Sequence, residues 1–175
     1  TALEEDVRHA RQDPSVGPIL VMGDFNARTG GEQEMMERLV PHLQPQWLDC
    51  PPRRSNDSTV NSAGNHLLGL CCRSNLRILN GRALGDVPAR PTRYGSRQES
   101  TSVVDYFLAC PDVWSKVTGL TVIQVPLRDN SRDHDALLME MCWFQDREEG
   151  HHGDDSRTYW YDWMVQPGTE GANMK

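Results

Sequence analysis

The sequence predicts a protein of the α+β class, with a layered α/β architecture as the related alternative. Stretches with helical character alternate with apolar, strand-like stretches in the first half of the chain. In the second half, strand-like stretches follow one another with polar segments between them. This order, mixed early and strand-rich late, is typical of α+β or layered α/β domains.

The first elements are a helix, a buried strand and a second helix. Residues 3–11 favour a helix because acids come early and arginines late, as the helix dipole prefers. Pro-containing pairs at 13–14 and 17–18 then interrupt the chain. Residues 19–22 form a short apolar run that ends at a glycine, which predicts a buried strand entering a loop. Residues 32–43 are interpreted as the second helix.

A third helix is expected at 65–74, where leucines and cysteines give the segment its apolar side chains. The next strand is expected at 76–79 and ends before an Asn-Gly pair. Residues 44–60 are rich in Pro, Arg, Ser, Asp and Asn, which predicts a loop. Residues 80–102 hold several Gly, Pro and Arg residues and are expected to form a long loop or a short hairpin.

Three further strands are predicted in the second half. Residues 103–110 form an apolar run interrupted by one acid. After a turn or short helix at 111–116, the alternation of apolar residues indicates a strand at 117–125. A last strand is expected at 136–144.

Residues 145–175 differ from the rest of the chain. They are acidic and aromatic without periodicity, so a disordered tail outside the domain is the prediction. A docking segment for another domain is the alternative. Residues 1–144 are then the folded domain.

Composition excludes some functions. The net charge of −7 gives no basic footprint of the kind that grips nucleic acid by charge alone. No apolar run is long enough for a membrane span, and no signal-peptide pattern occurs. The five cysteines include no C-x-x-C pair, which favours reduced thiols. We therefore expect an intracellular protein, nuclear or cytoplasmic and not secreted.

Three acids occupy positions where a carboxylate needs a partner. Asp24 follows a strand, Asp105 interrupts one, and Asp133 precedes one. With Asn26 and His134 beside them, they could bind a hard divalent cation and a phosphate. Each also has a simpler interpretation: a cap or turn for the first, an ion pair with an arginine for the second, and a solvated loop for the third.

The combination of motifs resembles the endonuclease/exonuclease/phosphatase (DNase I-like) superfamily. Gly-Asp-Phe-Asn at 23–26 is similar to its G-D-F-N motif, and Val-Asp-Tyr-Phe-Leu at 104–108 to its strand with an embedded aspartate. Asp-His at 133–134 is similar to its terminal S-D-H motif. The segments 61–71 and 76–82 resemble the LINE-type retrotransposon endonuclease branch. Three motifs in order are a strong signal, whereas one alone would be moderate.

The resemblance implies a four-layer α/β/β/α sandwich, incomplete at the N-terminus, and Mg²⁺-dependent phosphodiester hydrolysis, with Mn²⁺ as an alternative ion. It implies that Asp24 activates or orients the attacking water and that Asn26 helps to hold that aspartate or the phosphate. His134 would contact the scissile phosphate, Asp105 would orient the histidine, and Asp133 would lie near the metal. The implied metal ligands are Asp24, Asn26, Asp133 and His134.

The implied substrate is DNA, held by its phosphate backbone. Thr92 and Arg93 match a loop that touches this backbone, while Asn61 and Asn65 are weaker matches on the same face. Arg132 replaces the serine of the S-D-H motif, and its guanidinium could clamp a phosphate.

Alternatives remain open for the function. The leading expectation is a nicking or abasic-site DNA endonuclease of retrotransposon origin, with a following reverse-transcriptase or other domain as a partner. A phosphatase or phosphodiesterase acting on inositol or lipid phosphates is a second reading, and a catalytically dead remnant or interaction module is a third. Residues 1–144 correspond to the C-terminal two-thirds of the superfamily domain, and the early strands with their metal-binding glutamate are not seen. We therefore expect this chain alone to be poorly folded and inactive.

Overall fold

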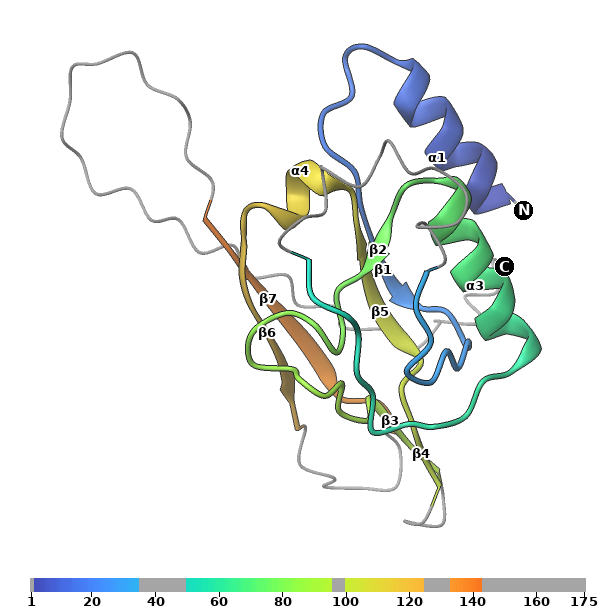
Figure 1. Ribbon diagram of the computed structural model, residues 1–175, viewed down its shortest axis with the longest axis vertical. Helices are drawn as coiled ribbons and strands as arrows, with labels where there is room; N and C mark the ends of the chain where they lie inside the picture. Colours follow the sequence, from blue (N-terminus) through green and yellow to red (C-terminus); the bar gives the residue numbers. More distant parts are fainter. Residues whose placement is uncertain (1, 35–49, 96–99, 125–132, 143–175) are drawn as a thin grey trace, which may run out of the picture.

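The computed structural model describes residues 2–34, 50–95, 100–124 and 133–142 (Figure 1). The predicted tail at 145–175, most of the predicted helix 32–43 and Arg132 lie outside the described residues. The elements, in chain order, are α1 (Ala2–Gln12), β1 (Leu20–Asp24), α3 (Ser62–Arg73), β2 (Arg77–Ile78), β3 (Arg93–Tyr94), β4 (Thr101–Ser102), β5 (Asp105–Ala109), α4 (Pro111–Trp114), β6 (Val117–Ile123) and β7 (Ala136–Met141).

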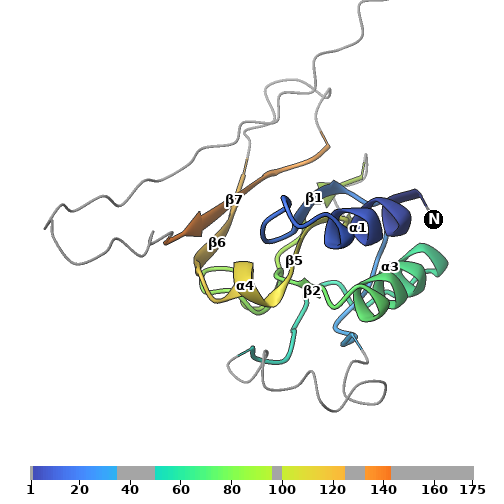
Figure 2. The same cartoon turned by 90° about the horizontal axis from the view of Figure 1, so that it is seen from above.

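Helices and small antiparallel sheets together confirm the α+β class. One sheet has the strand order β1-β5-β2, and the pairs β3-β4 and β6-β7 form two more. Seen from above, α1 and α3 lie on one side of the three-stranded sheet, and β6-β7 lies on the other (Figure 2). The full four-layer sandwich stays a prediction. No helix in the described part of the chain is long and apolar enough to cross a membrane.

Helix α3 begins three residues before its predicted start because Asn61 caps it. The Asn61 side-chain oxygen accepts hydrogen bonds from the backbone N–H groups of Gly64, at 2.7 Å, and Arg28, at 3.1 Å. The apolar face of α3 buries Leu67 and Leu70 against the sheet. At the other end of the helix, Arg73 forms two hydrogen bonds with Glu4, which ties α3 to α1.

The register of the central sheet positions two acids. Strand β5 lies between β1 and β2, and four of its five residues are buried. Asp24 pairs with Asp105 at the end of the β1-β5 ladder. The sequence pattern predicted both strands, but only the antiparallel pairing brings their acids together.

Strands β1 and β7 carry apolar side chains that the described residues cover only in part. Leu20, Val21 and Met22 of β1 are all half-buried. Leu137 and Leu138 are successive half-buried residues of β7, so both faces of this strand present apolar surface.

The N-terminal part of the predicted helix 32–43 is wrong, since residues 32–34 are not helical. A buried ion pair explains why residues 32–34 are not helical. Glu34 points inward, where its Oε1 accepts a hydrogen bond from the backbone N–H of Ile78 at 2.8 Å. Its Oε2 lies 2.7 Å from Nη2 of Arg82, and both side chains are fully buried. These contacts hold the backbone before residue 35 against β2 instead of in a helix.

Asp86 gives the first testable prediction. The residue is 1% exposed, and burial raises the pKa of its carboxyl to about 6. Since the folded-state pKa exceeds the ordinary value of 3.8, the protonated form favours folding, and this contribution is lost as pH rises through about 6. We expect Asp86→Asn to raise the free energy of unfolding by about 2–3 kcal/mol at pH 8 and by much less near pH 4.

Urea unfolding of the upstream-extended protein at pH 4, 6 and 8 measures this effect. Asp112→Asn, at an exposed position of α4, is the matched control and should change the free energy of unfolding little at any pH. An equal effect of Asp86→Asn at all three pH values would contradict the explanation.

Candidate active site

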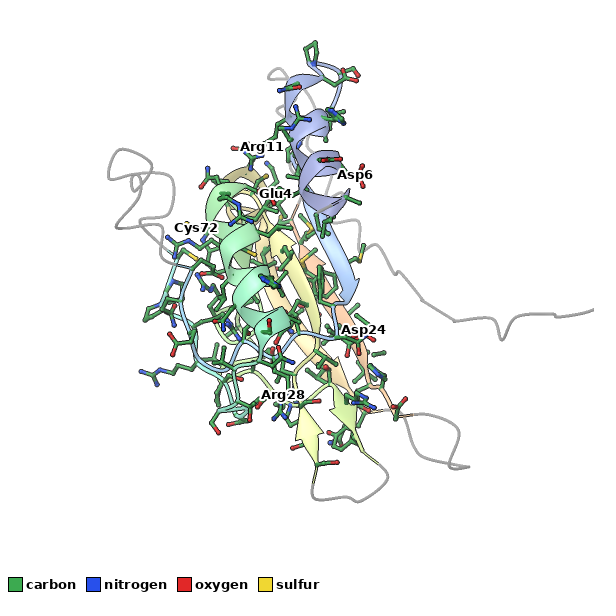
Figure 3. All side chains as sticks on the ribbon, turned by 90° about the vertical axis from the view of Figure 1, so that its right-hand side faces the viewer. Glu4, Asp6, Arg11, Asp24, Arg28 and Cys72 are labelled. Carbon is green, nitrogen blue, oxygen red and sulfur yellow. The ribbon has the colours of Figure 1, made fainter. Side chains whose placement is uncertain are left out.

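Three of the predicted site residues converge at one end of the sheet. Asp24 ends β1, Asp105 begins β5, and His134 lies just before β7. One ligand atom from each of the three lies within 4.8 Å of the others. We call Asp24, Asp105 and His134 the acid–imidazole cluster. Figure 3 shows Asp24 at the end of the β1 ribbon, in the same lower part of the view as Arg28 and far from Arg11.

The turn after β1 fixes the Asp24 carboxylate. Its Oδ1 accepts a hydrogen bond from the backbone N–H of Asn26 at 2.8 Å, and Asn26 itself has a φ of 48°. Asn tolerates this left-handed conformation better than most residues. Gly23 has a φ of 148°, which favours glycine. The Gly-Asp-Phe-Asn sequence therefore supplies the backbone that this turn needs.

Asp105 and His134 form a hydrogen-bonded pair. His134 Nδ1 and Asp105 Oδ2 lie 2.9 Å apart, and both side chains are partly buried. When Asp105 is ionised, Nδ1–H is the donor, which leaves Nε2 for another partner. This arrangement can orient an imidazole toward a substrate oxygen.

The electrostatic environment of Asp105 suits a cation. Burial raises the pKa of the Asp105 carboxyl, and the negative charge of Asp24 acts in the same direction. Hydrogen bonds with Thr92 and His134 oppose the rise in pKa without cancelling it. Two carboxylates this close repel each other, and a divalent ion between them would relieve that repulsion.

The cluster differs from the predicted set of metal ligands. It contains Asp24 and His134, adds Asp105, and does not contain Asp133. The Asp133 Oδ2 instead accepts a hydrogen bond from Arg93 Nε at 3.1 Å, while its Oδ1 lies 3.9 Å from His134 Nε2. Asn26 contributes its backbone N–H to Asp24, and its exposed side chain lies next to the cluster in sequence.

The residues that were predicted to contact the substrate lie in different surroundings, and some of them are not free to bind a ligand. Thr92 was expected to touch DNA, but it is fully buried and bonded to the protein, so it cannot reach a ligand as it lies. The side-chain oxygen of Asn61 is engaged in capping α3. Asn65 is exposed and lines a groove of about 560 Å³ that contains no residue of the acid–imidazole cluster. Arg93 remains accessible, with a side chain 44% exposed.

Asp57 is a site-supporting residue that the sequence reasoning missed. Its carboxylate accepts two hydrogen bonds from Arg28, at 2.6 and 2.8 Å, one from the N–H of Thr59 and one from the N–H of Val103. Burial alone would raise the pKa of Asp57, but these bonds hold it below its ordinary value. Asp57 thus connects the chain after Asp24 to the chain before Asp105. Because Asp57 is an acid in a polar loop, its contacts could not be inferred from the sequence.

Comparison with solved structures shows that the chain has the DNase I-like fold, which the motifs predicted. No protein-family profile matches the chain. No curated protein matches it either. At sequence identities below 20%, the structural likeness establishes the fold alone.

One similar structure is the endonuclease domain of TRAS1, a telomere-specific non-LTR retrotransposon, with 19% identity and a TM-score of 0.51. That match covers 82% of this chain and 52% of the TRAS1 domain. The 3′-5′ exonuclease NExo from Neisseria meningitidis has 17% identity and a TM-score of 0.54, over 81% of this chain and 51% of its own. NExo described as a 3′ phosphatase bound to a product DNA hairpin has 17% identity and a TM-score of 0.55, with the same coverage. The chain therefore spans about half the length of the solved structures it matches.

Proposed function

We propose that this chain carries the hydrolytic centre of a Mg²⁺-dependent DNA endonuclease, nicking or abasic-site directed and of retrotransposon origin. The observation that carries the proposal is the acid–imidazole cluster, in which three separate segments bring two carboxylates and an imidazole within 4.8 Å of one another. The fold, shared with nucleases, supports the same reaction class. DNA as the substrate agrees with a nuclear or cytoplasmic location.

The donor set fits a divalent cation. Carboxylate oxygens suit Mg²⁺, and an imidazole nearby also suits Mn²⁺. Asp24 and Asp105 would hold the ion, with Asn26, Asp133 and His134 adjacent to it. A bound ion would supply charge stabilisation at the phosphoryl oxygens.

The protein groups have distinct roles in the proposed reaction. Asp24, held by the Asn26 N–H, orients or deprotonates the attacking water. His134 presents Nε2 to a phosphoryl oxygen and stabilises the charge that develops on it. Asp105 fixes the ring through Nδ1.

Arg93 is proposed to contact the DNA backbone, together with Arg132 beyond the described residues. Its ion pair with Asp133 is exposed, so Arg93→Ala should change the free energy of unfolding by less than about 1 kcal/mol. Removal of one phosphate contact should weaken DNA binding and reduce the salt dependence of the affinity by about one charge. Fluorescence anisotropy with a DNA duplex at several salt concentrations measures both changes.

Arg11→Ala is the matched control, since it removes the same charge from α1, far from Asp24 (Figure 3). If the two substitutions reduce the affinity and its salt dependence equally, Arg93 makes no specific contact.

A second candidate function is 3′-end processing of DNA. It is favoured by the likeness to NExo, which is described as a 3′-5′ exonuclease and a 3′ phosphatase. Because the chain spans half of these structures, we also propose that it needs additional strands for activity, supplied upstream or by a partner domain. If the folded, extended protein has no activity, the alternative of a catalytically dead remnant is favoured.

A substrate panel distinguishes these functions. The chain and an upstream-extended form are incubated with Mg²⁺ and supercoiled plasmid, a duplex with a 3′-phosphate, or inositol phosphates. We expect nicked plasmid from the extended form. Release of phosphate from the 3′ end without nicking would favour end processing, release from inositol phosphates would favour the phosphatase alternative, and no product from a folded protein would favour the dead remnant.

A further inference from the structure

Thr92 connects three segments of the chain that meet at the acid–imidazole cluster. Its backbone N–H donates at 2.9 Å to the carbonyl of Ser102, the last residue of β4. Its carbonyl accepts from the N–H of Asp135 at 2.8 Å, one residue after His134. Its hydroxyl oxygen accepts from the N–H groups of Val104 and Asp105, each at 3.2 Å.

The backbone contact with the His134 segment extends over three residues. Arg93 forms an isolated antiparallel bridge with His134. On either side of this bridge, the N–H of Tyr94 donates to the carbonyl of Asp133 at 2.7 Å, and Thr92 accepts from Asp135. The segment that carries the imidazole is therefore aligned on residues 92–94.

The side-chain contact fixes the start of β5. A hydroxyl that accepts two N–H groups still has its own proton to donate, and the Thr92 hydroxyl acts on the Asp105 carboxyl by opposing the rise of its pKa. Thr92 is fully buried, so water cannot replace any of these bonds without rearrangement. One buried side chain thus holds the main chain at the start of β5, where Asp105 lies.

We propose that Thr92 is a positioning residue that sets the geometry of Asp105 relative to His134. Its hydroxyl holds the start of β5, where Asp105 lies, and its carbonyl holds the segment that carries His134. The proposal deepens the proposed function. The expected effect of Thr92 on the reaction rests on that function, whereas its effect on the geometry of Asp105 and His134 does not. It also replaces the expectation that Thr92 touches DNA, because a buried hydroxyl with these partners acts on the substrate only through Asp105 and His134.

A test that does not depend on activity uses the proton of the hydrogen bond between His134 Nδ1 and Asp105. In the upstream-extended protein this imidazole proton should give a downfield NMR signal, assigned by its loss in His134→Ala. Thr92→Val keeps the shape of the side chain and removes the hydroxyl, so we expect the signal to move upfield or disappear. Thr92→Ser keeps the hydroxyl and should retain the signal. Thr101→Val is the control. Thr101 is a half-buried residue of the neighbouring strand β4, and its substitution should leave the signal unchanged.

The second measurement separates positioning from general loss of structure. In the form of the chain that nicks DNA, Thr92→Val should lower kcat by about 10- to 100-fold, while KM for DNA stays within about threefold. Thr92→Ser should restore most of kcat. If the valine variant does not fold, Thr92→Ala and Thr92→Ser provide the comparison: both shorten the side chain, and only the alanine variant should lose kcat.

The outcomes distinguish this proposal from the proposed function. An NMR signal unchanged in Thr92→Val, or equal losses of kcat in the serine and alanine variants, would overturn the positioning role even if the protein is a nuclease. A signal lost in Thr92→Val and kept in Thr92→Ser would support the positioning role even if no form of the protein nicks DNA.

Discussion

Alanine in place of Asp24 or His134 is expected to lower the nicking rate of the upstream-extended protein by about a thousandfold or more. Asp24→Ala removes the carboxylate that the Asn26 N–H holds at 2.8 Å, and with it a proposed metal ligand and water activator. His134→Ala removes the group that Asp105 orients at 2.9 Å. Since the two residues are proposed to act in one step, the double variant should be little worse than either single one.

Matched substitutions of exposed residues control for this experiment. His66→Ala on α3 and Asp6→Ala on α1 remove the same groups from the surface and should leave the nicking rate within about twofold, since surface substitutions rarely perturb a fold. Nicking by His134→Ala at close to the wild-type rate would exclude the imidazole from the reaction. Single-turnover nicking of plasmid, followed on agarose gels, has the range needed to measure these changes.

The largest effect on stability is expected at the buried pair of Glu34 and Arg82. Both side chains are fully buried, with 2.7 Å between Oε2 and Nη2. Glu34→Ala would leave the guanidinium charged without this partner and would also remove the acceptor of the Ile78 N–H. Breaking such a pair by removing one partner costs about 3–5 kcal/mol, which is a large part of the stability of a small domain.

Urea unfolding of the extended protein measures this loss as a shift of the midpoint. Glu32→Ala, two residues earlier and exposed, is the control and should change the free energy of unfolding by less than about 0.5 kcal/mol. A loss below about 1 kcal/mol for Glu34→Ala would show that the pair contributes little net stability, as happens when desolvation offsets attraction.

The elements of the fold could largely be predicted from local sequence. Apolar runs located β1, β5, β6 and β7 to within a few residues, and the polar stretch 80–102 proved to contain the β3-β4 hairpin that was one of its two expected forms. The start of α3 was misplaced because the capping side chain of Asn61 lies outside the apolar pattern. The helix expected from residue 32 was wrong over residues 32–34, since a tertiary ion pair at Glu34 outweighs local helical preference.

The site was predictable in its chemistry and less so in its connections. The motifs identified Asp24, Asp105 and His134 as acids and an imidazole to examine, and the structure brings these three together. Strand partners are not encoded in an apolar pattern, so the pairing of Asp24 with Asp105 needed the structure. The burial of Thr92 depends on contacts from residues far along the chain, which is why a substrate contact was expected there instead.

The acid–imidazole cluster is proposed to hydrolyse phosphodiester bonds with the help of a divalent cation. The most direct test follows the nicking of supercoiled plasmid by the upstream-extended protein as Mg²⁺ is titrated, with EDTA as the blank and Asp105→Asn as the comparison. We predict saturable, EDTA-sensitive nicking by the parent protein and, at every Mg²⁺ concentration, a rate at least about tenfold lower for Asp105→Asn. Nicking that persists in EDTA, or that is equal in Asp105→Asn, would contradict the claim.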